Sequence, residues 1–426
     1  MPQDKTPPGV FDGRRALMEA ERCLYCFDAP CTTACPAHID IPGFIAMVRS
    51  GNGRGAAWVV RNANALADTC GRICPSEVYC QPACTRARQD APVRIRELHL
   101  FASRSVRGSE FRVESAPPTG KSVAVIGAGP AGLGCAIELV KLGHAVDLFN
   151  DGPPGGVPLK SIPPFRLPGE DLANDIAHCE RFVTAHNASV DAARFRSITG
   201  SHDAVFLAPG LGRDRRLGIP GESAKSVVPV LEFLETAKRR PDALRTGARV
   251  IVVGGGNVSL DAAATARRLG AKEVTLLYRR SEEHMLVWAA ELAEARRQGV
   301  EFRFRTTPVE IAGKDRVEGV LCRGMRLTDA IDESGRPVPV EIPGSDFRLP
   351  ADFVVVAIGQ EMSADWLGGI RRTKRGYVEV DGKFQTSMAG VFAGGDAVSG
   401  EGTVVRSLAQ GKQAAGAMHE FIMRRG

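Results

Sequence analysis

The chain has 426 residues, enough for about three domains, and its 44% hydrophobic and 24% charged residues are typical of a globular protein. Its net charge of +6 is spread along the sequence without a basic block interleaved with aromatic residues, so we expect no nucleic-acid partner. No apolar run approaches the roughly 18 residues of a membrane span, and the polar opening segment MPQDKTPPGVFDG lacks the features of a signal peptide. We therefore expect a cytoplasmic protein without a membrane segment.

Cysteines are concentrated near the amino terminus, where eight of the 11 precede residue 85. Their spacing is C-x2-C-x4-C-x3-C-P followed by C-x3-C-P-x4-C-x3-C. A disulfide framework is not expected in a reducing cytoplasm. Three clustered cysteines with a fourth before proline are typical of iron–sulfur ligands, and eight thiolates would serve two [4Fe–4S] clusters. Structural zinc, which usually takes two close cysteine pairs, is the alternative.

Helices are predicted between the two cysteine groups. Residues 41–64, IPGFIAMVRSGNGRGAAWVVRNAN, place their apolar residues three and four apart. The segment ESAPPTGK that follows the module is predicted to be a linker.

From Lys121 onward the sequence predicts a strand, a glycine turn, a helix and a second strand. Gly127, Gly129 and Gly132 fit the pattern G-x-G-x-x-G, with Pro130 and Ala131 at the start of the helix. The helix amino terminus and the close backbone favour a pyrophosphate, so this turn predicts a dinucleotide site. Asn150 stands at the strand end where a carboxylate usually accepts ribose hydroxyls, and the neighbouring Asp151 is an alternative acceptor.

The same plan repeats from Ala248. Gly254 and Gly256 begin the second turn, Asn257 and Val258 begin its helix, and Ser259 replaces the third glycine. Arg279 and Arg280 stand at the end of the next strand, where an NAD-binding domain places an acid. Because guanidinium groups bind a 2′-phosphate, we predict NADPH in preference to NADH, with a solvated surface pair as the alternative.

A last glycine turn, FAGGDAV, places Gly395 and Asp396 at a strand end. The carboxylate can bind a ribityl chain, and the helix from about Thr403 would direct its amino terminus at a flavin ring.

The predicted fold class is therefore α/β, with a helical iron–sulfur domain followed by two nested Rossmann-like domains that bind FAD and NAD(P)H. The expected boundaries are 1–115 for the helical domain, 116–235 and 350–426 for the FAD domain, and 236–349 for the NADPH domain. Since a flavin accepts two electrons as hydride and clusters carry one at a time, the combination predicts a two-to-one electron converter.

These motifs together resemble a family that comprises the small subunit of glutamate synthase, the amino-terminal half of dihydropyrimidine dehydrogenase and the bacterial subunit equivalent to that half. The resemblance runs from about Arg14 to the carboxyl end and is strongest for the dihydropyrimidine dehydrogenase branch. The segments that carry it are CLYCFDAPCTTACP, ADTCGRICPSEVYCQPACTRARQDAPVRI, IPPFRLP and VFAGGD.

The resemblance implies FAD, NAD(P)H and two [4Fe–4S] clusters, and it assigns the cluster ligands. The first cluster takes Cys23, Cys26, Cys31 and Cys84. The second takes Cys35, Cys74 and Cys80, whereas the equivalent of Cys70 is not a ligand. The fourth ligand is a glutamine in the dehydrogenase branch, and His99 stands at that position here. His99 is thus the predicted ligand, with Cys70 or water as the alternative.

The resemblance also implies further cofactor contacts and a partner. Gly156, Arg166 and Thr403 are expected beside FAD, and Ile358 and Gly359 beside the nicotinamide. No FMN-binding barrel follows the closing helix, so we expect a hetero-oligomer with an FMN-containing dihydropyrimidine dehydrogenase subunit. The alternatives are the large subunit of glutamate synthase, another reductase, or a non-catalytic redox-sensing or assembly role. No catalytic acid or base is predicted.

Overall fold

The computed structural model describes residues 10–106, 110–313, 316–400 and 402–424. The opening residues 1–9, which bear on the predicted absence of a signal peptide, lie outside this range. The chain divides into two compact units, and each is described by itself. Unit 1 consists of residues 1–159, 164–211 and 362–426, and unit 2 of residues 160–163 and 212–361.

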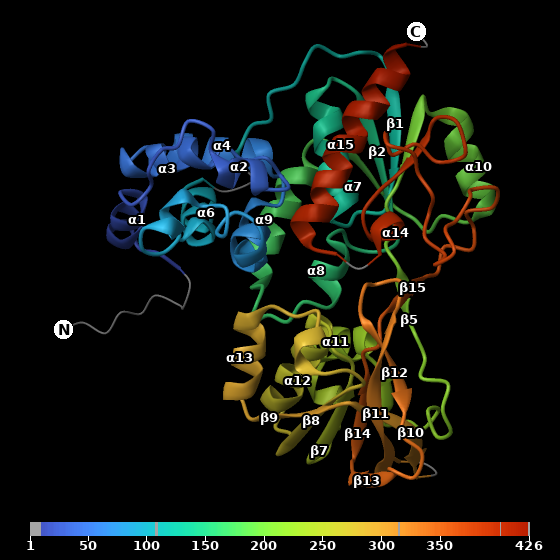
Figure 1. Ribbon diagram of the computed structural model, residues 1–426. Helices are drawn as coiled ribbons and strands as arrows, with labels where there is room; N and C mark the ends of the chain where they lie inside the picture. The colour runs from blue at the N-terminus through green and yellow to red at the C-terminus, as the bar shows by residue number, and fades with distance from the viewer. Residues whose placement is uncertain (1–9, 107–109, 314–315, 401, 425–426) are drawn as a thin grey trace. The chain divides into compact units, whose positions relative to one another are not determined.

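Unit 1 begins with a helical module that carries eight cysteines (Figure 1). Side-chain caps fix several helix starts: Asp12 accepts from Arg15 N, Asp40 from Gly43 N, and Asn52 from Gly55 N. The elements of the module are α1 (Gly13–Ala20), α2 (Pro30–Ala34), α3 (Ile41–Arg49), α4 (Gly53–Ala63), α5 (Ala67–Ile73), η1 (Ser76–Val78), η2 (Thr85–Arg88) and α6 (Ile95–Ser103). The helices predicted within 41–64 are thus α3 and α4.

The rest of unit 1 is built on a five-stranded parallel sheet in the order β16-β4-β1-β2-β3. Its central strands are continuous apolar runs, as expected for parallel strands covered on both faces. The strands are β1 (Ser122–Ile126), β2 (Ala145–Asn150), β3 (Thr184–Asn187), β4 (Ala204–Leu207) and β16 (Val391–Ala393). The helices are α7 (Pro130–Lys141), α8 (Gly156–Lys160, which ends in unit 2), α9 (Gly169–Glu180), α10 (Ala192–Ser201), α14 (Asp396–Ser399) and α15 (Val404–Met423).

Helices α7 and α15 lie side by side, although they are far apart in the sequence (Figure 1). Two glycines permit the close approach. A Cβ atom at Gly411 would lie 2.0 Å from the Ala131 carbonyl oxygen, and one at Gly134 would lie 2.7 Å from that of Leu408. The carboxyl-terminal helix is therefore an integral part of the first glycine-turn domain.

Unit 2 contains a second five-stranded parallel sheet in the order β6-β14-β7-β8-β9. The compact unit extends beyond the predicted segment 236–349 on both sides, because β6 and β14 complete this sheet. The parallel strands are β6 (Val227–Pro229), β7 (Arg249–Val253), β8 (Glu273–Tyr278), β9 (Val300–Phe304) and β14 (Phe353–Val356). The helices are α11 (Val230–Arg239), η4 (Pro241–Ala243), α12 (Asn257–Arg268), η5 (Glu282–His284) and α13 (Ala289–Arg297).

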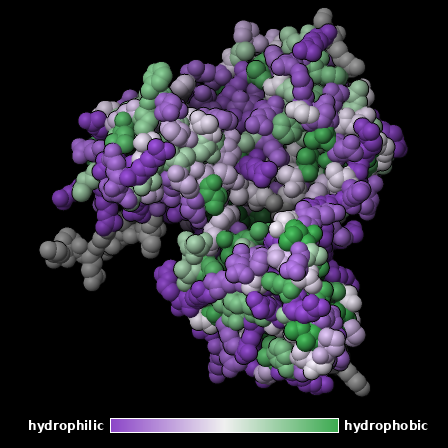
Figure 2. Space-filling view, viewed as in Figure 1, coloured by the Kyte–Doolittle hydropathy of each residue, from purple (hydrophilic) through white to green (hydrophobic). Residues whose placement is uncertain are grey.

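Smaller strands complete unit 2. An antiparallel sheet contains β10 (Thr306–Ala312), β11 (Gly319–Ile331), β12 (Pro337–Glu341) and β13 (Phe347–Pro350), and a two-stranded pair joins β5 (Gly212–Asp214) to β15 (Gln360–Met362). The face drawn in Figure 2 intersperses hydrophilic and hydrophobic residues. Within the described ranges, no helix combines the length and apolar character needed to cross a bilayer.

Candidate functional site

The three glycines of the first turn have different surroundings, as a dinucleotide site requires. Gly127 has φ +104°, and a Cβ there would lie 2.1 Å from the Ala208 carbonyl oxygen. A Cβ at Gly132 would lie 1.8 Å from the Gly127 carbonyl oxygen, so turn and helix pack without side chains. At Gly129, by contrast, the nearest atom to a Cβ is the Cα of Gly156, 3.9 Å away. The second glycine therefore leaves room for a phosphate to approach the backbone.

The other predicted FAD contacts in part converge on this turn. Gly395, with φ +71°, packs so closely that a Cβ would lie 2.8 Å from the Cβ of Ala131. The Asp396 carboxylate accepts a 3.1 Å hydrogen bond from the Ser407 hydroxyl. Thr403 caps α15 by accepting the backbone N–H of Arg406. Arg166 is half-buried, and its role beside FAD stays a prediction.

Asn150 is engaged by the protein backbone. Its Oδ1 accepts the Ala128 N–H at 2.9 Å, and its Nδ2 donates to the carbonyl oxygens of Gly152 and Pro153 at 2.8 and 3.2 Å. The amide thereby holds the glycine turn against the loop after β2. The predicted ribose contact would depend on the second lone pair of Oδ1. Asp151, the alternative acceptor, is exposed.

The second glycine turn repeats this geometry in unit 2. A Cβ at Gly254 would lie 2.1 Å from the Ala357 carbonyl oxygen, whereas one at Gly256 would meet nothing within 4 Å. The contact at Gly254 also places Ile358 and Gly359, the predicted nicotinamide contacts, just after the strand end beside this turn. Ile358 is 38% exposed, and Gly359 has φ +103°.

The loop after the arginine pair is tied to the second turn. Asn257, at the start of α12 next to Val258, accepts the Trp288 N–H at 3.1 Å through Oδ1 and donates to the Leu286 carbonyl at 3.3 Å. Leu286 N donates to the Gly255 carbonyl oxygen. The segment around Leu286 is therefore hydrogen-bonded to the glycine turn.

Arg279 and Arg280 do not act as a pair. Arg280 is buried, and its guanidinium bonds Asp332 Oδ2 at 2.5 Å and the Pro337 carbonyl oxygen at 2.8 Å. Arg279 keeps an exposed surface, but the protein partly desolvates its guanidinium, and this desolvation, followed by the nearby charges of Arg280 and Arg336, lowers its pKa. Arg336, which donates to the Tyr278 hydroxyl at 3.2 Å, is a basic neighbour that sequence reasoning missed. Arg280 therefore already holds a carboxylate, and the binding of a 2′-phosphate by the two arginines stays a prediction.

Four cysteines from two distant segments line one pocket in unit 1. Cys23, Cys26, Cys31 and Cys84 line this pocket together with Leu24, Thr85 and neighbouring residues. Tyr25 and Ala29, on either side of Cys26, adopt left-handed backbone angles of φ 50° and 38°. Burial raises the pKa of Cys31 to about 11, so a bound cation would be needed to hold this thiolate. The pocket fits the predicted ligand set of the first cluster.

The remaining predicted cysteine ligands lie deeper. Cys35 and Cys80 are buried and Cys74 is half-buried, and after burial itself their mutual proximity is among the causes that raise the pKa values of Cys74 and Cys80. Cys70 is also buried near Cys35. Among the described residues, no three His, Cys, Asp or Glu side chains are spaced to hold a single metal ion.

His99, on α6, has the environment of a ligand. Its ring is buried, and burial lowers its pKa to about 4, so it is neutral at pH 7. One ring nitrogen hydrogen-bonds the Ala67 backbone, whereas Nε2 is buried without a protein partner. Metal-binding histidines commonly donate one ring N–H to a carbonyl and bind metal through the other nitrogen. This orphaned atom fits the predicted role.

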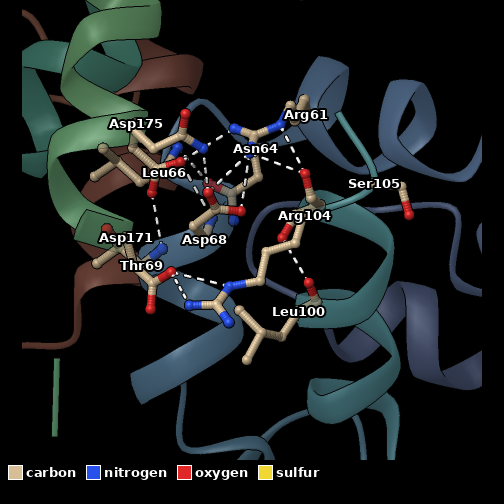
Figure 3. Close-up of polar contacts among 12 residues, drawn as sticks. Arg61, Asn64, Leu66, Asp68, Thr69, Leu100, Arg104, Ser105, Asp171 and Asp175 are labelled. Atoms are coloured by element: carbon tan, nitrogen blue, oxygen red, sulfur yellow. Dashed lines mark hydrogen bonds and ion pairs between the residues drawn. The ribbon is translucent and has the colours of Figure 1, made fainter. Parts of the chain in front are cut away.

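A buried ionic cluster that sequence reasoning missed joins α4, α5 and α9 (Figure 3). Arg61 of α4 pairs with Asp68 at 2.9 Å and with Asp175 of α9 at 3.2 Å. Asp175 also accepts the backbone N–H groups of Asp68 and Thr69, and so caps the helix that leads to Cys74. One turn earlier on α9, Asp171 pairs with Arg72 and Arg104. The cysteine module is thus joined to the first glycine-turn domain by buried charges.

Comparisons with known proteins identify the family of each part of the chain. The pyridine nucleotide-disulphide oxidoreductase family matches residues 121–415, and the family described as dihydropyrimidine dehydrogenase domain II, 4Fe-4S cluster, matches residues 5–110. The solved structure of FprA from Mycobacterium tuberculosis in complex with NADPH shares the fold, with a TM-score of 0.63 at 21% identity over 72% of this chain and 85% of that one.

Three curated relatives are similar over nearly the whole chain. The NADP(+)-dependent formate dehydrogenase subunit beta of Moorella thermoacetica is 36% identical over 92% of this chain, which spans 60% of that relative's length. The NADPH glutamate synthase small chain of Halomonas elongata is 35% identical, covering 96% and 91% of the two chains. The NAD-dependent dihydropyrimidine dehydrogenase subunit PreT of Escherichia coli is 32% identical, covering 99% and 98%. This chain therefore belongs to the pyridine nucleotide-disulphide oxidoreductase family and is an oxidoreductase whose flavin- and NAD(P)-binding domains follow a 4Fe–4S domain of the dihydropyrimidine dehydrogenase type.

Proposed function

We propose that this chain oxidises NADPH at FAD and passes the electrons singly, through two [4Fe–4S] clusters, to a separate partner subunit. The observation that carries the proposal is the pocket lined by Cys23, Cys26, Cys31 and Cys84, within the same compact unit as the first glycine turn. FAD supplies the exchange between hydride and single electrons, and the clusters supply one-electron steps.

In this scheme the chain's own residues bind and orient the nucleotide cofactors. Gly129 and Gly256 leave space for the pyrophosphates, and Arg279 would bind the 2′-phosphate of NADPH. The amino terminus of α15, at Thr403, carries a partial positive charge. This charge would face the predicted flavin and favour its reduced, anionic form. No side chain acts as an acid or base in the proposal.

Burial suggests the order of the clusters. The first ligand set is half-buried throughout, and Leu24 and Phe27 beside it are 41% and fully exposed. The second set is more buried. We place the second cluster next to the flavin and the first at the exit to the partner.

His99 is proposed as the fourth ligand of the second cluster, supported by its orphaned Nε2. A neutral imidazole in place of a thiolate raises a cluster's potential. H99C should retain the cluster with a lower midpoint potential in an anaerobic redox titration followed by electron paramagnetic resonance, whereas C70A should leave that signal unchanged. If C70A lost the signal and H99A kept it, the fourth ligand would be Cys70 and not His99.

The preferred partner is an FMN-containing dihydropyrimidine dehydrogenase subunit, because the match between this chain and PreT covers nearly the full length of each. The large subunit of glutamate synthase is the second candidate. Anaerobically purified protein should contain about eight iron atoms per chain and lose its flavin absorbance near ~450 nm when NADPH is added. A non-catalytic redox-sensing or assembly protein would bind NADPH without bleaching, and a capture experiment from native extract identifies the acceptor.

A further inference from the structure

Tyr79 links the second cysteine group to the helix that carries the predicted flavin contact. Its hydroxyl lies 3.0 Å from the Thr403 hydroxyl, and its backbone immediately precedes Cys80. We infer that Tyr79 is a positioning residue for electron transfer between flavin and second cluster, an inference that rests on the function proposed above. Both residues belong to unit 1.

The loop that carries Tyr79 is held together by backbone hydrogen bonds. Ser76 N donates to the Cys74 carbonyl at 2.8 Å, and the Ser76 carbonyl accepts from Tyr79 N at 3.2 Å and Gln81 N at 3.0 Å. These bonds close the segment between Cys74 and Cys80 on itself. An anchor at Tyr79 therefore fixes the position of both cysteines relative to α15.

A second anchor lies farther along α15. Lys412 donates to the Ala37 carbonyl oxygen at 3.1 Å and also bonds that of Ala63. This contact holds the middle of the helix to the cysteine module. Since it lies more than two turns beyond Thr403, it acts away from the helix amino terminus, where the flavin is proposed and where the Tyr79 contact lies.

The hydrogen-bonding capacity of Thr403 allows either hydroxyl to donate in this contact. Its hydroxyl oxygen accepts the Arg406 N–H at 3.3 Å, which leaves one lone pair and one proton. When Tyr79 donates to that lone pair, the Thr403 proton is directed to an acceptor in front of the helix. In the transfer step one electron leaves the reduced flavin and is taken up by the oxidised cluster, and the Tyr79 proton stays on its hydroxyl.

Y79F removes only the hydroxyl, and Y25F is a matched control. Tyr25 also adjoins a cysteine, Cys26, but its hydroxyl bonds the Ala20 carbonyl oxygen at 3.4 Å. In stopped-flow mixing with NADPH, Y79F should bleach its flavin at the wild-type rate, and cluster reduction should slow about three- to tenfold. Its flavin midpoint potential should also shift, with iron content and unfolding temperature unchanged. Y25F should match the wild type in all five measurements.

Variants of Thr403 provide an independent test if Y79F folds poorly. T403V should reduce the cluster as slowly as Y79F does. T403S, which keeps the hydroxyl, should reduce it at the wild-type rate. A Y79F protein with wild-type transfer and an unchanged flavin potential overturns the inference, as does T403S that remains as slow as T403V. A wild-type protein that holds no iron or does not bleach overturns the proposed function instead.

Discussion

Arg61 and Asp175 form an ion pair, Nη1 to Oδ1 3.2 Å, in which neither side chain has any exposed surface. Asp68 shares the same guanidinium through both carboxylate oxygens. Burial, followed by the nearby Asp68, raises the pKa of Asp175 to about 7, and Arg61 is the cation that both acids share. Loss of this guanidinium would leave two buried carboxyl groups without their ionic partner. We expect R61M to lower the free energy of unfolding by about 3–5 kcal/mol, measured by urea denaturation of the apoprotein.

A matched cluster in unit 2 provides the control for R61M. Arg323 also pairs with two carboxylates, those of Glu341 and Asp346, but these side chains are 30–50% exposed. R323M should cost no more than about 1 kcal/mol. If R61M and R323M lost equal free energies of unfolding, burial of the ion pairs around Arg61 would not be the cause of the large effect.

Gly256 offers a clean test of the second dinucleotide turn. Its φ is −109° and a Cβ there would meet no atom within 4 Å, so G256V should fold normally. The added side chain would occupy the space left for the pyrophosphate. We expect normal flavin content with an apparent KM for NADPH raised roughly tenfold or more. G129V, at the equivalent position of the first turn, should instead lose flavin. A G256V protein with an unchanged KM for NADPH would show that the second turn is not part of the NADPH site.

Nucleotide preference should depend on Arg279. R279A removes a charge-assisted contact to the 2′-phosphate and should raise the KM for NADPH about tenfold or more, with little change for NADH. R280A leaves Asp332 without its buried partner and should lower the unfolding temperature while preserving the ratio of the two KM values. A variant R279A with equal effects on both nucleotides would contradict the assignment.

A pair of histidines in unit 1 predicts a pH-dependent stability. His144 Nε2 lies 2.9 Å from His419 Nδ1, and the Thr119 hydroxyl lies 2.8 Å from His144 Nδ1. Burial, followed by the nearby His419, lowers the pKa of His144 from 6.5 despite the opposing charge of Asp203. The folded protein keeps this ring neutral, so the unfolded chain takes up a proton first as the pH falls.

The stability that His144 contributes is therefore present above pH 6.5 and lost as the pH falls below it. The unfolding temperature of the wild type should decrease between pH 7.5 and 5.5. H144Q, which cannot take up a proton, should show a smaller decrease in the same series. Parallel curves for the two proteins would show that another group causes the pH dependence.

Local motifs were predictable because their chemistry is contained in a few consecutive residues. The glycine turns at Gly127 and Gly254 required only the strand, the turn and the helix start. The grouping of Cys84 with Cys23 came from the family resemblance, and the pocket fits it. Contacts between distant segments were not predictable in this way. Asp332, which holds Arg280, comes from a hairpin 52 residues away, and Asp175 lies 114 residues from Arg61.

Strand β16 completes the edge of the first sheet, next to β4, only after all of unit 2 has been synthesised. On the ribosome, unit 2 can thus fold while β4 still exposes an unpaired edge, the kind of surface that promotes aggregation of nascent chains. Release before residue 391 would leave that edge open and α7 without its companion helix. Loading of the prosthetic groups into unit 1 is consequently expected to follow translation, and truncated products should be prime substrates for chaperones and proteases.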